Sequence, residues 1–269
     1  MKLAAVAPAT AAVFRCAYAV PVLWLLARRE GGPPRSRRVA LAAGLLFALD
    51  LVFWHQAIDD VGAGLATVLG NSQVLFVGAL AWALLGERPE ARLLAAAPLV
   101  LLGVVLISGV LEDGAYGDHP VRGVVFGVLT GLSYAGFILV LRRGAGDAGG
   151  PAGSLLDATV VAAVASAVMG AAIGDVDLAP SWPAHGWLVL LALSSQVFGW
   201  MLISTSLPRL PAALSSVLLT LQPVGSVILG VVLLGESPTG LQVAGVTLVL
   251  FGVISLALGR RRRRAPAPA

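Results

Sequence analysis

Residues 84–89 read LLGERP and residues 233–238 read LLGESP, so one short motif occurs twice in a chain of 269 residues. In both copies an apolar run ends in Leu-Gly-Glu, and a proline follows two residues after the glutamate. Glycine just after an apolar run and a proline soon after it are typical of a helix that ends and enters a turn. The motif therefore predicts two helix ends of the same kind, 149 residues apart.

The chain is too apolar for a water-soluble domain. Hydrophobic residues make up 58% of it and charged residues 12%, whereas soluble domains contain roughly 45–50% and about 25%. The apolar residues form blocks, and about 20 such residues cross a membrane as a helix. We therefore predict an all-α polytopic membrane protein with nine transmembrane helices, at residues 8–27, 39–58, 65–85, 92–110, 123–141, 154–173, 187–207, 212–234 and 240–258.

The arginines predict how the chain is oriented. One set of alternate connectors, together with the C-terminal tail, holds 15 arginines, while the N-terminus and the other connectors hold only Lys2 and Arg122. Because Lys and Arg accumulate on the cytoplasmic side, we predict a multi-pass protein of the inner (cytoplasmic) membrane with a cytoplasmic C-terminus. The same distribution explains the net charge of +4 without a nucleic-acid partner.

The two motif copies belong to a longer duplication. At the 149-residue offset Gln73 aligns with Gln222, and LVLLGV at 99–104 aligns with LVLFGV at 248–253. Five predicted spans lie between the copies, and because five is odd the copies face opposite sides of the membrane. Such an inverted-repeat helical bundle is a signature of secondary transporters, whose two halves rock around a central site.

Three segments resemble one known family: GLATVLGNSQVLFVGALAWALLGERP (64–89), AALSSVLLTLQPVGSVILGVVLLGESP (212–238) and RGVVFGVLTGLSYAGFILVLRR (122–143). On these segments the chain resembles the EamA-type transporters of the drug/metabolite transporter superfamily. The resemblance implies ten helices, five in each half, export of small metabolites or drugs, and coupling to an ion gradient or to exchange.

The chain departs from that pattern at its beginning. The helix at 123–141 opens the second half, and its partner at the 149-residue offset would precede residue 1, so the family's first helix is missing. We expect either that this helix has been lost or that the true start lies upstream of Met1, and we favour the second alternative. The predicted organisation is a first repeat of four helices at 1–110, a second repeat of five helices at 121–259, and a basic cytoplasmic tail at 260–269.

Two charged residues lie inside predicted spans, where ionisable groups usually serve a function or pair with one another. Asp50 is at the middle of its span and Arg15 is about a third of the way into the first one. We predict that Asp50 exchanges a proton for substrate or is a structural partner of Arg15, and the two roles are compatible. For Arg15 the alternatives are a bidentate contact to a substrate carboxylate, the pair with Asp50, or a side chain that extends to the membrane surface.

Polar amides and aromatic residues complete the candidate substrate site. Gln73 and Gln222 occupy equivalent positions near the middle of their helices, and Asn71 lies close to Gln73 but about 200° around the helix. The alternative for these amides is a hydrogen bond between helices. Tyr134, Gln196 and Trp200 are predicted to supply aromatic walls and hydrogen bonds to an amphipathic ligand.

Glycines at 123, 127 and 131 form consecutive GxxxG steps. This spacing lets two helix backbones approach closely. We predict packing within the bundle, with a homodimer contact as the alternative.

Motifs of enzymes are missing from the sequence. It contains no HExxH, no GxSxG and no Walker glycine loop, so we expect no enzyme activity, no metal site and no cofactor. The expected partners are a small-molecule substrate, the lipid bilayer and protons as a candidate coupling ion. The sequence predicts a secondary transporter that exports a small metabolite, such as an amino acid or a drug-like compound, by alternating access. The alternative is a non-transporting membrane scaffold or partner subunit, or an inactive truncated transporter.

Overall fold

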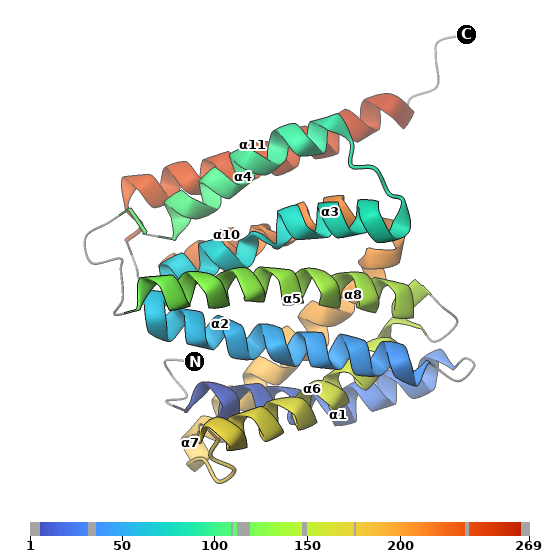
Figure 1. Ribbon diagram of the computed structural model, residues 1–269, viewed down its shortest axis with the longest axis vertical. Helices are drawn as coiled ribbons and strands as arrows, with labels where there is room; N and C mark the ends of the chain where they lie inside the picture. Colours follow the sequence, from blue (N-terminus) through green and yellow to red (C-terminus); the bar gives the residue numbers. More distant parts are fainter. Residues whose placement is uncertain are drawn as a thin grey trace. The chain divides into compact units, whose positions relative to one another are not determined.

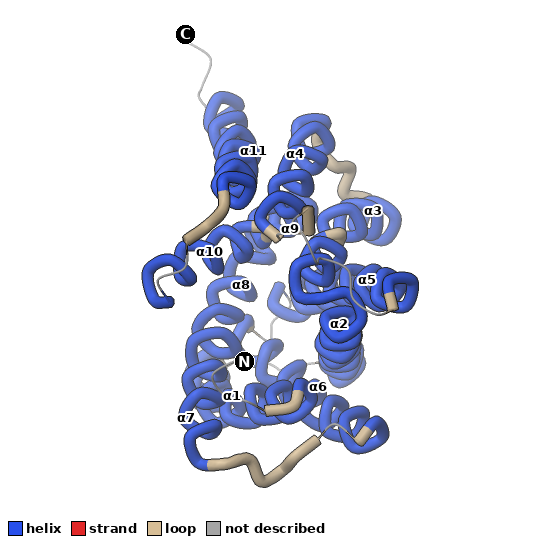
Figure 2. The backbone as a smooth tube through the Cα atoms, turned by 90° about the vertical axis from the view of Figure 1, so that its left-hand side faces the viewer, coloured by secondary structure: helices blue, strands red, loops and turns tan. Residues whose placement is uncertain are grey.

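The computed structural model describes residues 6–31, 36–108, 110–111, 119–146, 150–174, 176–234 and 237–264 (Figure 1). Helices and short loops account for these residues, and no strand occurs among them (Figure 2). The helical elements are α1 (Pro8–Glu30), α2 (Arg37–Asn71), α3 (Gln73–Leu85), α4 (Ala91–Ile107), α5 (Pro120–Gly146), α6 (Pro151–Ile173), α7 (Trp182–Leu191), η1 (Ala192–Gly199), α8 (Trp200–Ser206), η2 (Leu207–Arg209), α9 (Ala212–Leu219), α10 (Leu221–Leu234) and α11 (Gly240–Arg264).

The predicted spans coincide with helices in the described part of the chain. Helix α2 contains one whole predicted span and the start of the next. The two parts are separated by a kink at Gly62, whose φ of 80° favours glycine. Six helical stretches are long and apolar enough to cross a membrane, and three shorter apolar helices lie at 91–107, 212–225 and 240–255. The fold is that of a polytopic helical membrane protein, as the sequence predicts.

Exposed apolar side chains give the helices a surface suited to lipid. On α5, the side chain of Val125 is 53% exposed and that of Leu132 is 42% exposed, whereas Gly123 and Gly127 are buried. In a water-soluble helix the large apolar residues would face inward and polar residues would face out. Helix α5 also buries large apolar side chains such as Phe137 and Ile138, so it is apolar on its exposed and its buried faces, as expected of a helix in a membrane.

The helices form two compact units, each with segments from both predicted repeats. Unit 1 consists of residues 1–55 and 133–211, and unit 2 consists of residues 56–132 and 212–269. Helices α2 and α5 contribute a segment to each unit. The two predicted repeats themselves remain a prediction from the sequence.

Unit 1 is built on the close packing of α1 against α6 (Figure 1). At one end the Glu30 carboxylate accepts hydrogen bonds from the backbone N–H groups of Ala152 (3.0 Å) and Gly153 (3.3 Å), at the first turn of α6. A carboxylate there also interacts favourably with the helix dipole. The Thr10 hydroxyl accepts a hydrogen bond from the Asp177 N–H at 2.8 Å, so side chains of α1 bind the first turn of α6 and the loop that follows this helix.

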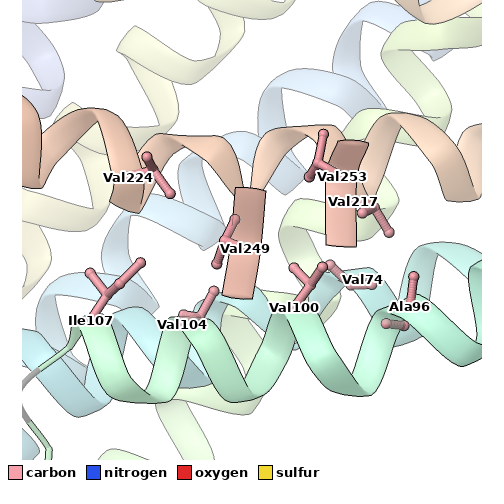
Figure 3. Packing of buried hydrophobic residues seen from close by; sticks show 10 residues of the cluster. Val74, Ala96, Val100, Val104, Ile107, Val217, Val224, Val249 and Val253 are labelled. Carbon is pink, nitrogen blue, oxygen red and sulfur yellow. The ribbon is translucent and has the colours of Figure 1, made fainter. Parts of the chain in front are cut away.

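Unit 2 contains the packing of α4 against α11, side by side in Figure 1. Buried valine and isoleucine side chains of α4 point toward those of the neighbouring helices (Figure 3). The two backbones approach most closely at Gly103 and Gly245, where a Cβ added to either glycine would lie within 3 Å of the other's carbonyl oxygen. Small residues allow this approach, which dispersion then stabilises in the absence of a hydrophobic driving force.

The glycines at 123, 127 and 131 of α5, called the glycine stripe below, allow close packing within unit 2. A Cβ added at Gly123 would collide with Val61, and one added at Gly127 would collide with Leu69, both on α2. The predicted packing within the bundle is therefore present, and the stripe gives no support to a homodimer.

We expect Gly103→Ala and Gly245→Ala to lower the thermal stability of the purified protein, by about 1–3 kcal/mol each, because a methyl group would overlap the facing backbone. The control is Gly240→Ala on the same helix, where an added Cβ meets nothing within 4 Å. Unfolding in detergent would measure the difference, and equal midpoints for Gly245→Ala and Gly240→Ala would contradict the packing described.

Candidate functional site

Five of the eight predicted site residues come together in unit 1. Each lies on a different element or stretch: Arg15 on α1, Asp50 on α2, Tyr134 on α5, Gln196 on η1 and Trp200 at the start of α8. We call the cluster that they form with Phe47, Phe137 and Thr159 the Arg15 cluster.

Arg15 is held in place by a chain of hydrogen bonds. Its Nε donates to Oε1 of Gln196 at 2.9 Å, and Nε2 of Gln196 donates to the hydroxyl oxygen of Thr159 on α6 at 3.0 Å. Gln196 and Thr159 are fully buried. Because the amide oxygen must accept and the amide nitrogen must donate, the two contacts fix the orientation of Gln196 and, through it, that of the guanidinium.

The other half of the guanidinium is left available. Within the described residues, the two terminal nitrogens of Arg15 have no hydrogen-bond acceptor, and the half-buried carboxylate of Asp50 has no donor. The charges of the two residues attract each other, yet no direct ion pair between them is formed in the described part of the chain. The described residues therefore contain no salt bridge between Arg15 and Asp50, and their structural pairing stays a prediction.

Aromatic rings lie next to these charges. The Arg15 guanidinium carbon lies 5.5 Å from the centroid of the Phe47 ring, within the range of a cation–π interaction. Phe47 stacks on Phe137 with centroids 4.6 Å apart. Trp200 packs edge-on against Phe137 at 4.9 Å, and Tyr134 packs against Trp200 at 6.0 Å. The cluster thus combines a cation and an anion with an apolar aromatic wall.

The helix that carries Gln196 is locally wound as a π-helix. From Ala192 to Gly199 the hydrogen bonds span five residues, so that the N–H of Trp200 donates to the carbonyl of Ser195. Such wide turns inside α-helices occur frequently at functional sites. Here Gln196 contacts α1 and α6, while Trp200 contacts α2 and α5.

The remaining three candidates belong to unit 2. Nδ2 of Asn71 donates to the Thr67 carbonyl of its own helix at 2.8 Å. Nε2 of Gln73 donates to the Ser216 carbonyl of α9 at 3.1 Å, which is the interhelical hydrogen bond weighed as an alternative. Gln222, on α10, is exposed. The two glutamines, equivalent in the sequence, thus differ in burial.

Sequence reasoning missed Phe47, Phe137 and Thr159. Helical spacing provides a signal for the first two, because Phe47 precedes Asp50 by three residues and Phe137 follows Tyr134 by three. Thr159 is an isolated hydroxyl in an apolar helix, and no pattern in the sequence connects it to Gln196. Within the described ranges, no three His, Cys, Asp or Glu side chains are close enough to hold a metal ion.

A polytopic helical bundle with charged and polar side chains clustered inside its spans is typical of membrane transport proteins. The comparison with known families agrees with this class. The EamA-like transporter family matches residues 1–109 and 121–258. The chain belongs to this family, whose members are transporters rather than enzymes.

Individual relatives share sequence over most of the chain. An uncharacterised protein of Pseudomonas aeruginosa is 31% identical over 254 residues, covering 94% of this chain and 84% of its own. The threonine/homoserine exporter RhtA of Salmonella typhimurium is 27% identical over 210 residues, which are 77% of this chain and 65% of RhtA. A crystal structure of a protein that is 20% identical superposes with a TM-score of 0.81, covering 97% of this chain and 91% of the other, and it shows the same fold.

We expect Gln196→Leu to lower the free energy of unfolding by about 1.5–3 kcal/mol, because it removes the acceptor of the buried hydrogen bond that the charged Arg15 guanidinium donates. Combining it with Arg15→Met in a double-mutant cycle isolates that contact. Gln196→Leu should lower the free energy of unfolding in detergent clearly less in the Arg15→Met background than in the parent chain. Ser194→Ala, at an exposed position of the same π-helix, is the control. Strictly additive losses would show that the two side chains do not interact.

Proposed function

We propose that this chain is a secondary transporter that exports a free amino acid or a closely similar zwitterion by alternating access of its two inverted halves. The observation that supports it most is the Arg15 cluster. There a fixed guanidinium and a carboxylate lie in one unit beside an aromatic wall, and among the residues that the structure describes the guanidinium's terminal nitrogens have no acceptor and the carboxylate has no donor.

A zwitterion suits both charges at once. Its carboxylate accepts two parallel hydrogen bonds from the terminal nitrogens of Arg15, the geometry in which guanidinium and carboxylate bind best. Its ammonium group binds the Asp50 carboxylate, and its side chain packs on the aromatic rings. A ligand with one charge would leave the opposite protein charge uncompensated in an apolar environment, which is costly.

The family and one relative support the direction and the substrate class. RhtA is by name an exporter of threonine and homoserine, both of which are zwitterions. We further propose that Asp50 binds the coupling proton when substrate has left, so that proton and substrate alternate at one carboxylate. The proposal includes an inner-membrane location with the C-terminus in the cytoplasm, supported by the arginine distribution.

The transport test uses the full chain in proteoliposomes with labelled threonine and other amino acids. We expect saturable flux of one or a few of them, driven by a proton gradient. Arg15→Gln should raise the substrate concentration at half-maximal flux about 10- to 100-fold, because charge-assisted hydrogen bonds are lost. Asp50→Asn should abolish gradient-driven flux.

Two matched controls carry the same chemical changes at exposed positions, namely Arg209→Gln and Asp59→Asn, and both should transport as the parent chain does. If Arg15→Gln left the substrate concentration at half-maximal flux unchanged, the assignment of the site would be contradicted. Absence of flux for every compound, also in a version extended upstream, would favour a non-transporting scaffold or an inactive truncated transporter.

The orientation is tested separately with reporters fused to the C-terminus. A fluorescent protein that matures only in the cytoplasm should be bright, and alkaline phosphatase, which is active only outside it, should be inactive. The opposite pair of signals would reverse the orientation of every connector.

A further inference from the structure

Four helices of unit 1 meet at one of their ends. The Glu30 carboxylate, at the last residue of α1, accepts a hydrogen bond from the N–H of Ala152 at the start of α6, at 3.0 Å. A Cβ added to Gly144, near the end of α5, would lie 3.1 Å from Val39 of α2 and 3.2 Å from the Ser154 hydroxyl of α6. The end of α1, the start of α2, the end of α5 and the start of α6 therefore lie together.

A fifth element joins them, and arginines are concentrated on all of these segments except α6. Nε of Arg142, on α5, donates to the Leu207 carbonyl of η2 at 3.1 Å. The exposed arginines at this end of unit 1, called the arginine patch below, are Arg28, Arg29, Arg37, Arg38, Arg143 and Arg209. Positive charge from four separate elements is thus gathered at one place.

The protein does not neutralise the arginine patch. Within the described ranges, none of its six side chains donates a hydrogen bond or forms an ion pair. Glu30 lies among them, but its carboxylate is bound by the first turn of α6. Even with Glu30 and Asp157 of α6 counted as full negative charges, positive charge dominates. By contrast, Arg122 of the opposite set of connectors is paired with Asp60.

One arginine of the patch indicates its depth in the membrane. The Arg28 guanidinium carbon lies 3.7 Å from the centroid of the Trp24 ring, one helical turn earlier on α1. Tryptophan is enriched at the boundary between the hydrocarbon and the lipid headgroups. The ring contacts one face of the guanidinium, whereas the N–H donors lie in the guanidinium plane and remain available. Arg28 is therefore held at the height of the lipid phosphates.

The surface beside the arginine patch is apolar. On α1 the side chains of Trp24 and Leu25 are 43% and 54% exposed, and on α2 that of Leu41 is 51% exposed. A soluble anion such as inorganic phosphate gains nothing from such side chains. A phospholipid presents a phosphate and acyl chains directly next to it. Charge beside exposed apolar surface therefore matches a lipid better than a free anion.

We propose that the arginine patch binds the headgroup of an anionic phospholipid, with phosphatidylglycerol as the probe. The guanidinium groups donate charge-assisted hydrogen bonds to the phosphate, and the acyl chains lie against the exposed apolar side chains. A zwitterionic lipid has the same phosphate but brings a positive choline group toward the arginines. In the proposed orientation the patch faces the cytoplasm, where anionic lipids make the membrane surface negative. The inference goes beyond the proposed function and does not depend on the substrate.

The test uses the full chain purified in an uncharged detergent, and follows its thermal unfolding midpoint as phospholipid is added. A ligand that binds the folded state raises this midpoint. Dioleoylphosphatidylglycerol should raise it until the response saturates. Dioleoylphosphatidylcholine, with identical acyl chains, should raise it clearly less. A higher salt concentration should weaken the response to phosphatidylglycerol, because salt screens exposed charges.

Two variants locate the binding site. Arg28→Gln combined with Arg37→Gln should raise the phosphatidylglycerol concentration at half-maximal response about 10- to 30-fold, the effect of removing two charges near anionic headgroups. Trp24→Leu should raise it about threefold, because the stacked arrangement of Arg28 is lost.

Each variant has a matched control. Arg88→Gln combined with Arg92→Gln makes the same change at exposed positions of unit 2, on a connector of the same arginine-rich set. Trp187→Leu removes a tryptophan of unit 1 that is also 43% exposed. Both controls should respond to phosphatidylglycerol as the parent chain does.

Three results would overturn the proposal: equal responses to the two lipids, equal losses of affinity in the two arginine pairs, or a response to inorganic phosphate alone as large as that to phosphatidylglycerol. The last would indicate an anion site that does not require a lipid. Should Trp24→Leu fail to fold, the two arginine pairs decide. The measurement involves no transport, so its outcome leaves the proposed function to be tested separately.

Discussion

The hydrocarbon interior of a membrane contains no water, so every buried polar group must find its partner within the protein. In this chain side chains from distant parts of the sequence supply those partners. Glu30 binds the first turn of α6 and Glu87 binds the first residue of α9. The Gln73 side chain donates to the Ser216 carbonyl of α9, and the Gln196 side chain accepts from Arg15. Each contact satisfies one group and at the same time fixes which helices are neighbours.

The same constraint makes the Arg15 cluster stand out. In unit 1 the hydrogen-bond chain from Thr159 through Gln196 ends at a guanidinium whose terminal nitrogens have no acceptor within the described residues. Asp50 is attracted to that charge without touching it. By contrast, Asp60 in unit 2 is bound directly by Arg122 through several hydrogen bonds. This pair of opposite charges beside aromatic rings is the feature of unit 1 on which the proposed substrate site rests.

The spans and the family were predictable from the sequence because apolar blocks and the doubled Leu-Gly-Glu motif are local signals. Arg15 and Asp50 were found because charge inside a span is rare. The partner of Arg15 could not be read, since Gln196 lies 181 residues away and no periodicity links the two. Gln73 and Gln222 illustrate a different limit. Their shared register was visible, but the sequence does not show that Gln73 is buried against α9 while Gln222 is exposed.

The π-helix from Ala192 to Gly199 has a further consequence for divergence within the family. A π-turn contains about one residue more than an α-turn of similar length. A relative with one residue fewer in this segment can therefore keep the flanking helices in register and alter only the wall beside Arg15. If the Arg15 cluster binds substrate as proposed, the length of this segment, and not residue identity alone, is a means of changing substrate preference. In alignments of related chains, a one-residue gap at this place would mark a change in the wall of the proposed site.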